Sequence, residues 1–171
     1  MRKLLLLSVC FVFSGQVMLP GQDVGNPGPD FTVSLQGGGT YNLADQAGKV
    51  VFVYLFGNTC PFCIGSGPSI ESTIYQAFKG NSDFTAIGLD TWNSSSNESS
   101  VSSFRNKTGI TFPLAIKAGS VASDYETTYD RIMVIDKHGK LFHKGIVAAG
   151  NDINNAVTAI TQSLAEIVEV D

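Results

Sequence analysis

Residues 50–63 read VVFVYLFGNTCPFC, and this stretch decides the fold. Its first half, VVFVYLF, is a continuous apolar run of the kind found in a central strand that is buried on both faces of a sheet. The run ends at Gly57, and two cysteines, Cys60 and Cys63, follow one helical turn apart. Pro61 favours a helix start here, because proline has no N–H to lose in the first turn and its φ is already suitable. We therefore predict a strand, a tight turn and a helix, with the cysteine pair at the junction.

The segments on either side of this junction alternate between strands and helices. FTVSL and TYNL flank a run of glycines, which predicts a short hairpin across residues 31–43. The helix that starts at the cysteines should run to about Phe78, with a kink at Pro68. The remaining predicted elements are strands at 84–90 and 131–136, an extended segment at 110–116, a strand LFHKG, helices over VSSFRNKTG and SVASDYE, and an amphipathic helix at 151–169. Strands joined through helices indicate a parallel component and the late hairpin an antiparallel edge, so we predict an α/β fold with a mixed sheet and helices on both faces.

The first residues have the pattern of a secretory signal. A positive MRK is followed by the apolar run LLLLSVCFVF at 4–13 and then by small and polar residues. The run is too short to span a bilayer, which takes about 20 residues. We predict a signal peptide at 1–21, one domain at 22–171 and export to the periplasm or the extracellular space, with no stable membrane span after signal removal. The alternatives are a buried N-terminal element, a lipoprotein attached through Cys10, and a retained segment that anchors the chain in the membrane.

The composition narrows the class of protein. Apolar residues make up 43% of the chain and charged residues 15%, which is typical of a globular protein. The net charge is −4 and no basic stripe is present, so we expect no nucleic-acid partner. Of three cysteines, Cys10 leaves with the predicted signal. Cys60 and Cys63 can then pair only with each other within the chain, and such a disulfide persists in an exported compartment.

A Cys-x-x-Cys pair serves several kinds of chemistry. A structural zinc site takes four ligands, but the only histidines, His138 and His143, lie on a predicted hairpin far along the chain, and no second cysteine pair exists in the mature sequence. A c-type haem site needs a histidine directly after the second cysteine, where this chain has Ile64. A static disulfide across so short a loop removes little unfolded-chain entropy and stabilises weakly. The remaining chemistry is thiol–disulfide exchange, and we predict no metal and no cofactor.

The position of the pair supports exchange. Free N–H groups and the dipole at a helix N-terminus stabilise a thiolate, so we predict Cys60 to be the exposed nucleophile. Cys63 lies one turn further on, and we predict that it is more buried and resolves the mixed disulfide. Electrons would pass between this pair and a protein dithiol or disulfide partner.

Several stretches of the chain carry a resemblance to a known family. They are PGPDFTVSLQGGGTYNLADQAGKVVFVYLFGNTCPFC, FTAIGLDTWN, GITFPLAI, SDY and RIMVIDKHGKLFHKG. Over roughly residues 27–169 the chain resembles the thioredoxin-fold redoxins of the AhpC/TSA-redoxin superfamily, and above all the exported TlpA-like thiol–disulfide oxidoreductases. The resemblance implies a thioredoxin-like three-layer α/β/α sandwich with a mixed central sheet and an added N-terminal β-hairpin. It also implies that Cys60 is the nucleophile, Cys63 the resolving thiol and Pro68 the kink proline of the active-site helix.

The chain departs from this family in the loop before RIMVID. The family has a cis-proline at the position of Asp130, which Tyr129 precedes here. Because a cis peptide at a non-proline residue costs about 2.5–4 kcal/mol, we expect a trans or rebuilt loop. By resemblance this loop docks the substrate chain and shields the thiols, and a carboxylate at Asp130 near Cys60 would raise the pKa of the thiol.

The residues around the pair also differ from the family. Thr59 stands where thioredoxin has an aromatic residue, and GSG at 65–67 stands where many relatives carry an acidic one. We expect Thr59, Pro61 and Phe62 to shape the site. Tyr54 stands where thioredoxin has a buried aspartate that assists proton transfer, and we expect it to pack in the core.

Two other functions remain open. The peroxiredoxin motif P-x-x-x-T-x-x-C would place Cys63 at the peroxidatic position, with Arg131 near the place of a peroxidase arginine, but Phe56 and Cys60 replace its Pro and Thr. A thiol peroxidase is therefore one alternative. A non-catalytic redoxin-like binding domain is the other, and the missing cis-proline supports it.

Three further side chains are expected to have no chemical role. Trp92 should pack at the edge of a loop, His138 should be solvated in a turn, and His143 should be exposed on a strand. The sequence therefore concentrates the chemistry at the cysteine pair.

Overall fold

The computed structural model describes residues 23–166, so the predicted signal peptide and Cys10 lie outside the described residues. The strands are β1 (Thr32–Leu35), β2 (Thr40–Asn42), β3 (Val50–Phe56), β4 (Phe84–Asp90), β5 (Leu114–Ile116), β6 (Arg131–Ile135) and β7 (Leu141–Lys144). The helices are α1 (Pro61–Ile70), α2 (Gln76–Phe78), α3 (Glu98–Thr108), α4 (Gly119–Asp124) and α5 (Ala149–Ala165), with a 3₁₀ turn η1 (Ala44–Gln46) and a π-helical turn η2 (Glu71–Tyr75). Strands and α-helices follow one another in the predicted order.

A mixed seven-stranded sheet forms the centre of the described region, in the order β2-β1-β5-β4-β3-β6-β7. β3 runs parallel to β4 and antiparallel to β6, and every residue of β3 is buried. The run VVFVYLF suits this place because both faces of a central strand are covered. The predicted central strand and the predicted mixed sheet are confirmed.

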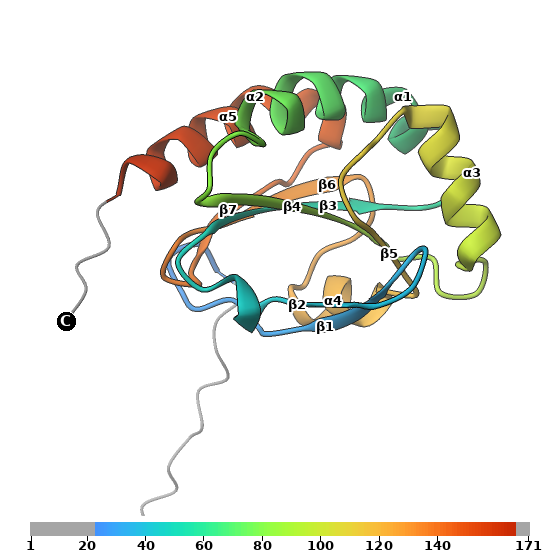
Figure 1. Ribbon diagram of the computed structural model, residues 1–171, viewed down its shortest axis with the longest axis horizontal. Helices are drawn as coiled ribbons and strands as arrows, with labels where there is room; N and C mark the ends of the chain where they lie inside the picture. The colour runs from blue at the N-terminus through green and yellow to red at the C-terminus, as the bar shows by residue number, and fades with distance from the viewer. Residues whose placement is uncertain (1–22, 167–171) are drawn as a thin grey trace, which may run out of the picture.

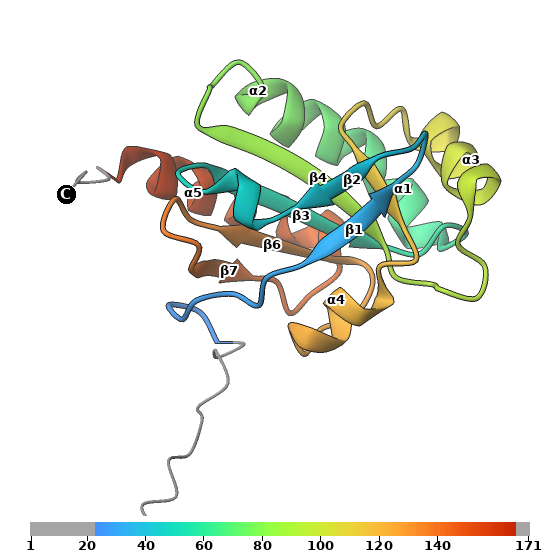
Figure 2. The ribbon, with the colours of Figure 1, turned by 60° about the horizontal axis from the view of Figure 1, so that its bottom comes forward.

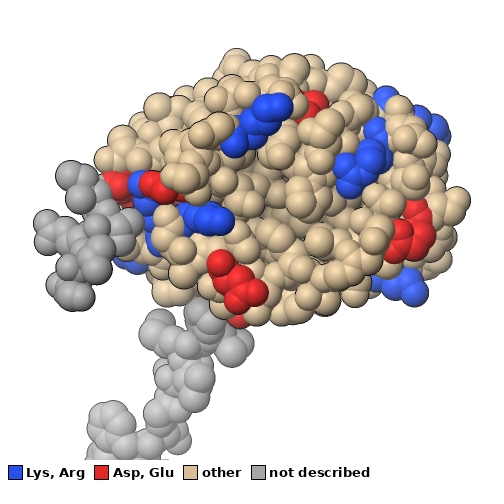
Figure 3. All heavy atoms as spheres, in the orientation of Figure 1, with Lys and Arg blue, Asp and Glu red and all other residues tan. Residues whose placement is uncertain are grey.

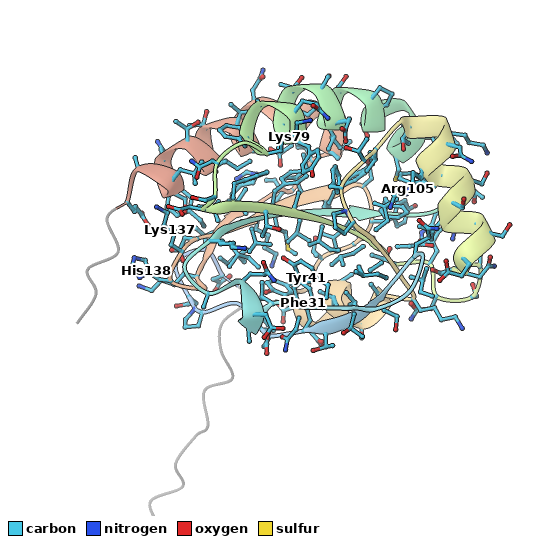
Figure 4. The ribbon with its side chains drawn as sticks, in the orientation of Figure 1. Phe31, Tyr41, Lys79, Arg105, Lys137 and His138 are labelled. Atoms are coloured by element: carbon cyan, nitrogen blue, oxygen red, sulfur yellow. The ribbon has the colours of Figure 1, made fainter. Side chains whose placement is uncertain are left out.

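Helices cover one face of the sheet. The β1–β2 hairpin is paired with the sheet through β5 and folds over the other face, which it covers together with one helix. Figure 1 shows α1, α2 and α5 above the sheet, α3 at its right-hand end, and α4 below it beside the β1–β2 hairpin. Val101 and Phe104 of α3 join the core cluster on the helical side. Successive residues of β3 point to opposite faces, so Tyr54 belongs to the core cluster on the helical side and Leu55 to the cluster on the hairpin side. Phe31 and Tyr41 fill the space between hairpin and sheet (Figure 4), and Figure 2 shows the hairpin crossing in front of the sheet. The predicted three-layer arrangement with an added hairpin is confirmed.

The active-site helix is interrupted where the sequence predicts one kinked helix. α1 ends at Ile70, and a π-helical turn, η2, joins it to α2. Pro68 lies inside α1 and has no N–H to donate, so the helical hydrogen-bond ladder loses a bond there. The backbone N–H of Glu71 is shared between the carbonyls of Gly67 and Pro68. Directly after it, the helical hydrogen bonds change from the α-helical to the wider π-helical spacing. The predicted kink at Pro68 therefore takes the form of a π-helical turn.

Two other helix ends test the sequence prediction. Gly109, with φ at 72°, ends α3 as predicted, because glycine adopts the left-handed conformation without strain. α5 ends at Ala165, earlier than the predicted residue 169, because the backbone of Glu166 is extended. The predicted end at 169 was therefore wrong.

The sheet topology brings two loops together at one edge. The cysteine pair follows the carboxyl end of β3, beside the end of β4, where Phe56 is paired with Asp90. Because β6 is antiparallel to β3, its first residue Arg131 pairs with Leu55, and Asp130 lies at this same edge. The β6–β7 turn lies at the opposite edge, which Figure 4 marks with Lys137 and His138. The positively charged side chains visible in Figure 3 are interspersed with acidic ones and form no stripe on that face.

Candidate active site

The turn after β3 is fixed by its neighbours on β4 and in the following loop. A Cβ on Gly57 would overlap the indole of Trp92, so only glycine fits between the strand and the ring. The buried amide of Asn58 donates to the Asp90 carboxylate over 2.8 Å and to the Ser95 hydroxyl over 2.9 Å. These contacts hold the chain that leads into the cysteine pair. The sequence analysis missed Asn58 and Asp90, although both are polar residues at the ends of adjacent buried strands.

Cys60 is the N-cap of α1, as the strand-to-helix pattern predicts. Its backbone is extended, with φ at −63° and ψ at 118°, and Pro61 occupies the first helical position. The Cys60 sulfur accepts the backbone N–H of Cys63 over 3.2 Å. This bond places a donor and the positive end of the helix dipole against the sulfur, the arrangement in which a helix N-terminus favours negative charge.

The two thiols are free and both are buried. Cys60 is 2% exposed and Cys63 is 0% exposed, so the order of burial is as predicted but the prediction of an exposed Cys60 was wrong. Both sulfurs belong to the core cluster on the helical side of the sheet, and Trp92 packs against that cluster. The neighbouring side chains Thr59 and Phe62 face solvent instead, and Phe62 is 77% exposed.

Cys63 sits in surroundings that keep its proton in place. Burial raises the pKa of the Cys63 thiol well above its ordinary value, and its hydrogen bond to Cys60 and the negative charge of Asp130 raise it further. The Tyr54 hydroxyl donates to the Cys63 carbonyl over 3.0 Å and lies 3.3 Å from the Ser66 hydroxyl. Burial also raises the pKa of Tyr54, so this side chain is a neutral donor that packs in the core, as expected.

The loop before β6 is rebuilt around Asp130. No peptide bond within residues 23–166 is cis, and Asp130 has a positive φ of 56°. Its carbonyl and its carboxylate Oδ1 accept the backbone N–H of Ala149, at 3.1 and 3.3 Å. The expected trans loop is therefore present, and Asp130 caps the start of α5. The carboxylate raises the pKa of Cys63 and, more weakly than burial does, the pKa of Tyr54.

Tyr129 and Trp92 form an aromatic edge beside the pair. Their rings meet edge to face with centroids 5.1 Å apart, which confirms that Trp92 packs at the edge of a loop. Tyr129 remains partly exposed. Together with Phe62, Ile146 and Val147, which are also exposed, it supplies apolar surface on loops near the start of α1 and α5.

A groove runs between the starts of α1 and α5. It has a volume of about 430 Å³, and its walls include Phe62 and Ser66 of α1, Asp130, and Asn151 and Ile153 of α5. Asp130 is only 7% exposed, so its carboxylate lies at the base of this groove rather than on the surface. Ser66 links this groove to the cysteine pair, since its hydroxyl donates to the Cys63 carbonyl over 3.3 Å.

The histidines do not join the cysteines. His138 is exposed in the β6–β7 turn at the far edge of the sheet, as expected (Figure 4). His143 was expected to be exposed, but its Nε2 lies 2.8 Å from Oδ2 of Asp152, a carboxylate that α5 buries. Within residues 23–166, no three or more His, Cys, Asp and Glu side chains come together in a way that could hold a metal ion. No helix in this same region is long and apolar enough to cross a membrane.

Comparison with known proteins agrees with this arrangement. The family model described as Redoxin matches residues 23–160. A protein from Bacteroides thetaiotaomicron with a provisional assignment as a protein disulfide isomerase is 28% identical, with a TM-score of 0.74, and the match covers 84% of this chain and 91% of that one. No curated protein matches the chain.

Two further solved structures share the fold at lower identity. One, from Chlorobium tepidum, is provisionally assigned as the thiol:disulfide interchange protein DsbE; it is 19% identical over 84% of this chain and 99% of that one, with a TM-score of 0.71. The other is a secreted disulfide oxidoreductase of Mycobacterium tuberculosis, 19% identical over 77% of this chain and 95% of that one, with a TM-score of 0.63. The predicted thioredoxin-like fold is confirmed.

Proposed function

The chain belongs to the Redoxin family, and from this premise we propose that it is a thiol–disulfide oxidoreductase that exchanges a Cys60–Cys63 disulfide with a protein partner outside the cytoplasm. The observation that carries the proposal is the capping bond at the start of α1. The first sulfur of the pair accepts a backbone N–H at a helix N-terminus, and the second lies fully buried one turn behind it. This is the division of labour that exchange requires, with one sulfur for attack and one for resolution.

The reaction proceeds in two displacements. The Cys60 thiolate attacks one sulfur of the partner disulfide, and the other partner sulfur leaves as a thiolate. Cys63 then attacks the Cys60 sulfur, the bond between Cys60 and the partner breaks, and the second partner sulfur leaves. The partner gains two electrons and two free thiols, and this chain gains a Cys60–Cys63 disulfide. The same steps in reverse oxidise a dithiol partner.

Partner binding is assigned to the apolar surface beside the pair. Phe62, Tyr129 and Ile146 are exposed around the starts of α1 and α5, and Ile146 is 85% exposed. Exposed apolar groups of this size on loops near a reactive pair suit contact with an unfolded or extended polypeptide. The secretory pattern of residues 1–21 and the secreted relative from Mycobacterium tuberculosis support an extracytoplasmic site of action.

The test uses the two single cysteine variants as a matched pair. Cys63→Ser should accumulate mixed disulfides with an exported protein pool and release them on addition of dithiothreitol, because the attacking sulfur remains and the resolving one is gone. Cys60→Ser should accumulate almost none. Wild-type protein should catalyse the reduction of insulin disulfides by dithiothreitol, and loss of either sulfur should abolish the catalysis. Equal catalysis by the wild type and both variants would sink the proposal.

The peroxidase alternative receives no support from the geometry. A peroxidatic cysteine must ionise and meet peroxide, whereas Cys63 is fully buried with a raised pKa. Arg131 uses its guanidinium to donate to the carbonyl of Asp130 over 2.8 Å. Peroxide consumption that depends on Cys63 and survives Cys60→Ser would reverse this ranking.

A further inference from the structure

The resolving step requires a proton acceptor beside Cys63. In the free dithiol, the Cys63 thiol is hydrogen-bonded to the Cys60 sulfur. Once Cys60 has joined a partner in a mixed disulfide, its sulfur carries no charge and is a poor acceptor. Cys63 is fully buried, and a thiol attacks a disulfide only after it has lost its proton.

Among residues 23–166, the side chains that donate to the Cys63 carbonyl are those of Tyr54 and Ser66, and neither is a base at neutral pH. Tyr54 approaches the Cys63 carbonyl and is kept neutral by burial. Ser66 donates to the carbonyls of Phe62 and Cys63, at 3.0 and 3.3 Å. A phenol and an aliphatic hydroxyl in these roles donate hydrogen bonds and do not take a proton from a thiol at neutral pH.

A carboxylate from another element lines the same groove as Ser66. Asp130 lies at the edge of the sheet where β3 ends and α1 begins, and its charge acts on both Cys63 and Tyr54. Its left-handed backbone and its bonds to the Ala149 N–H fix the carboxylate at the base of the groove. The groove offers the proton a route to solvent, since its volume of about 430 Å³ has room for water.

The other ionisable groups around Asp130 already have partners. Arg131 of β6 donates to the Asp130 carbonyl. Asp152, in the first turn of α5, pairs with His143 of β7 and accepts from Asn155. From β3 and α1, the titratable groups on which its charge acts are Tyr54 and Cys63.

We propose that Asp130 is the base that removes the proton of Cys63 when the mixed disulfide is resolved. The inference rests on the proposed function and assigns a residue to its second displacement. The Cys63 S–H bond breaks and its proton passes to the Asp130 carboxylate, while the Cys63 sulfur forms a bond with the Cys60 sulfur. The bond between Cys60 and the partner breaks, and the partner sulfur leaves with the electron pair. The proton then leaves Asp130 through the groove.

The two displacements can be timed separately with 5,5′-dithiobis(2-nitrobenzoic acid). The first thionitrobenzoate is released when Cys60 attacks the reagent, and the second when Cys63 resolves the mixed disulfide. Stopped-flow absorbance should be recorded from about pH 5 to pH 9 for the wild type, Asp130→Asn and Tyr54→Phe. Asparagine keeps the size of the side chain and an oxygen for the Ala149 N–H, so the cap of α5 persists.

Asp130→Asn should slow the second release about 10²–10⁴-fold near pH 6–7, the range that general acid–base catalysis contributes. The first release should change less than threefold, and the gap in the second should close toward pH 9 as hydroxide replaces the carboxylate. Tyr54→Phe should leave the second release within threefold. A second release in Asp130→Asn that is as fast as in the wild type, or faster, would overturn the proposal, because a carboxylate that acts only through its charge slows ionisation of Cys63.

The wild-type pH profile decides the matter even if Asp130→Asn does not fold. With a carboxylate base, the second release should level off between about pH 6 and pH 8. If the rate of the second release instead rises tenfold per pH unit across that range, hydroxide is the base that removes the Cys63 proton, and the assignment of Asp130 is refuted. The absence of the first release in wild-type protein would instead refute the proposed function.

Discussion

Two loops meet at the carboxyl end of β3, and they reach their conformations by different means. The start of α1 follows local rules, because Cys60 is the N-cap and Pro61 occupies the first helical position. In the loop that precedes β6, Glu126 and Asp130 both have positive φ although neither is glycine. Glu126 adopts it in the local hydrogen-bond pattern that ends α4, where its N–H donates to the Ser123 carbonyl. Asp130 is instead held by its bonds with the Ala149 N–H at the start of α5, which no local pattern encodes. The comparison teaches that one half of the candidate site is determined by its own sequence and the other by the fold around it.

The largest change in stability is expected from Asp130→Pro, which gives the second loop the proline that the family has at this position. Asp130→Pro should destabilise the protein by about 3 kcal/mol or more, because proline fixes φ near −65° and the native φ is 56°. The proline also removes the carboxylate that accepts the Ala149 N–H. Urea unfolding followed by circular dichroism measures the change. Asp130→Asn is the matched control and should cost less than about 1 kcal/mol, because asparagine tolerates the left-handed region.

A stable Asp130→Pro protein would show that the loop can adopt the family conformation with little cost. In that event, the rebuilt loop would be a property of the side chain at this position alone, and the contrast between the two loops would disappear.

The first loop is tested by adding one methyl group. Gly57→Ala should cost about 1–3 kcal/mol, because its Cβ would overlap the Trp92 indole and the ring is packed against Tyr129. Gly65→Ala is the control within α1, where a Cβ meets nothing within 4 Å, and it should stabilise the helix by about 0.5–1 kcal/mol. Equal effects of the two substitutions on the urea midpoint would contradict the role assigned to Trp92.

The contrast between the loops also marks how far the sequence could predict the structure. The apolar run of β3, the start of α1 and the end of α3 at Gly109 are set by neighbours in the chain, and all were predicted. The bonds of Asn58 to Asp90, of His143 to Asp152 and of Asp130 to Ala149 were not, because each joins residues that only the tertiary fold brings together.

The burial of Cys60 was mispredicted for the same reason. A helix N-terminus is ordinarily open to solvent, and the local pattern gave no sign that the core cluster reaches it or that Trp92, from the loop after β4, packs against that cluster. The family resemblance did locate the loop of Tyr129 and Asp130, since the missing proline marked it. It could not show that the carboxylate would accept the Ala149 N–H at the start of α5 and act on Cys63.

The buried Cys63 thiol makes the free energy of unfolding of the reduced protein depend on pH. The folded pKa of Cys63 is raised, chiefly by burial, so the folded state keeps a proton that the unfolded chain releases near its ordinary value of about 8.5. The stabilisation is complete below that pH and is lost above it, at about 1.4 kcal/mol per pH unit. Between about pH 8 and pH 10, the free energy of unfolding should fall by about 1–2 kcal/mol more in reduced wild type than in Cys63→Ala. Parallel curves for the two proteins, measured by urea unfolding, would contradict the burial of this thiol.

The smallest changes in stability are expected from glycine substitutions at Glu126 and Asp130, the two residues of the second loop with positive φ. Glu126 is exposed and has a positive φ of 46°, so Glu126→Gly should stabilise the protein by about 0.5–1 kcal/mol through relief of that strain. Asp130→Gly relieves similar strain but removes the carboxylate, while the backbone carbonyl at this position still accepts the Ala149 N–H, so the gain in stability should be smaller than in Glu126→Gly. Thermal unfolding of the two variants in one buffer compares them directly. Equal gains in both variants would mean that the Asp130 carboxylate adds nothing at the start of α5.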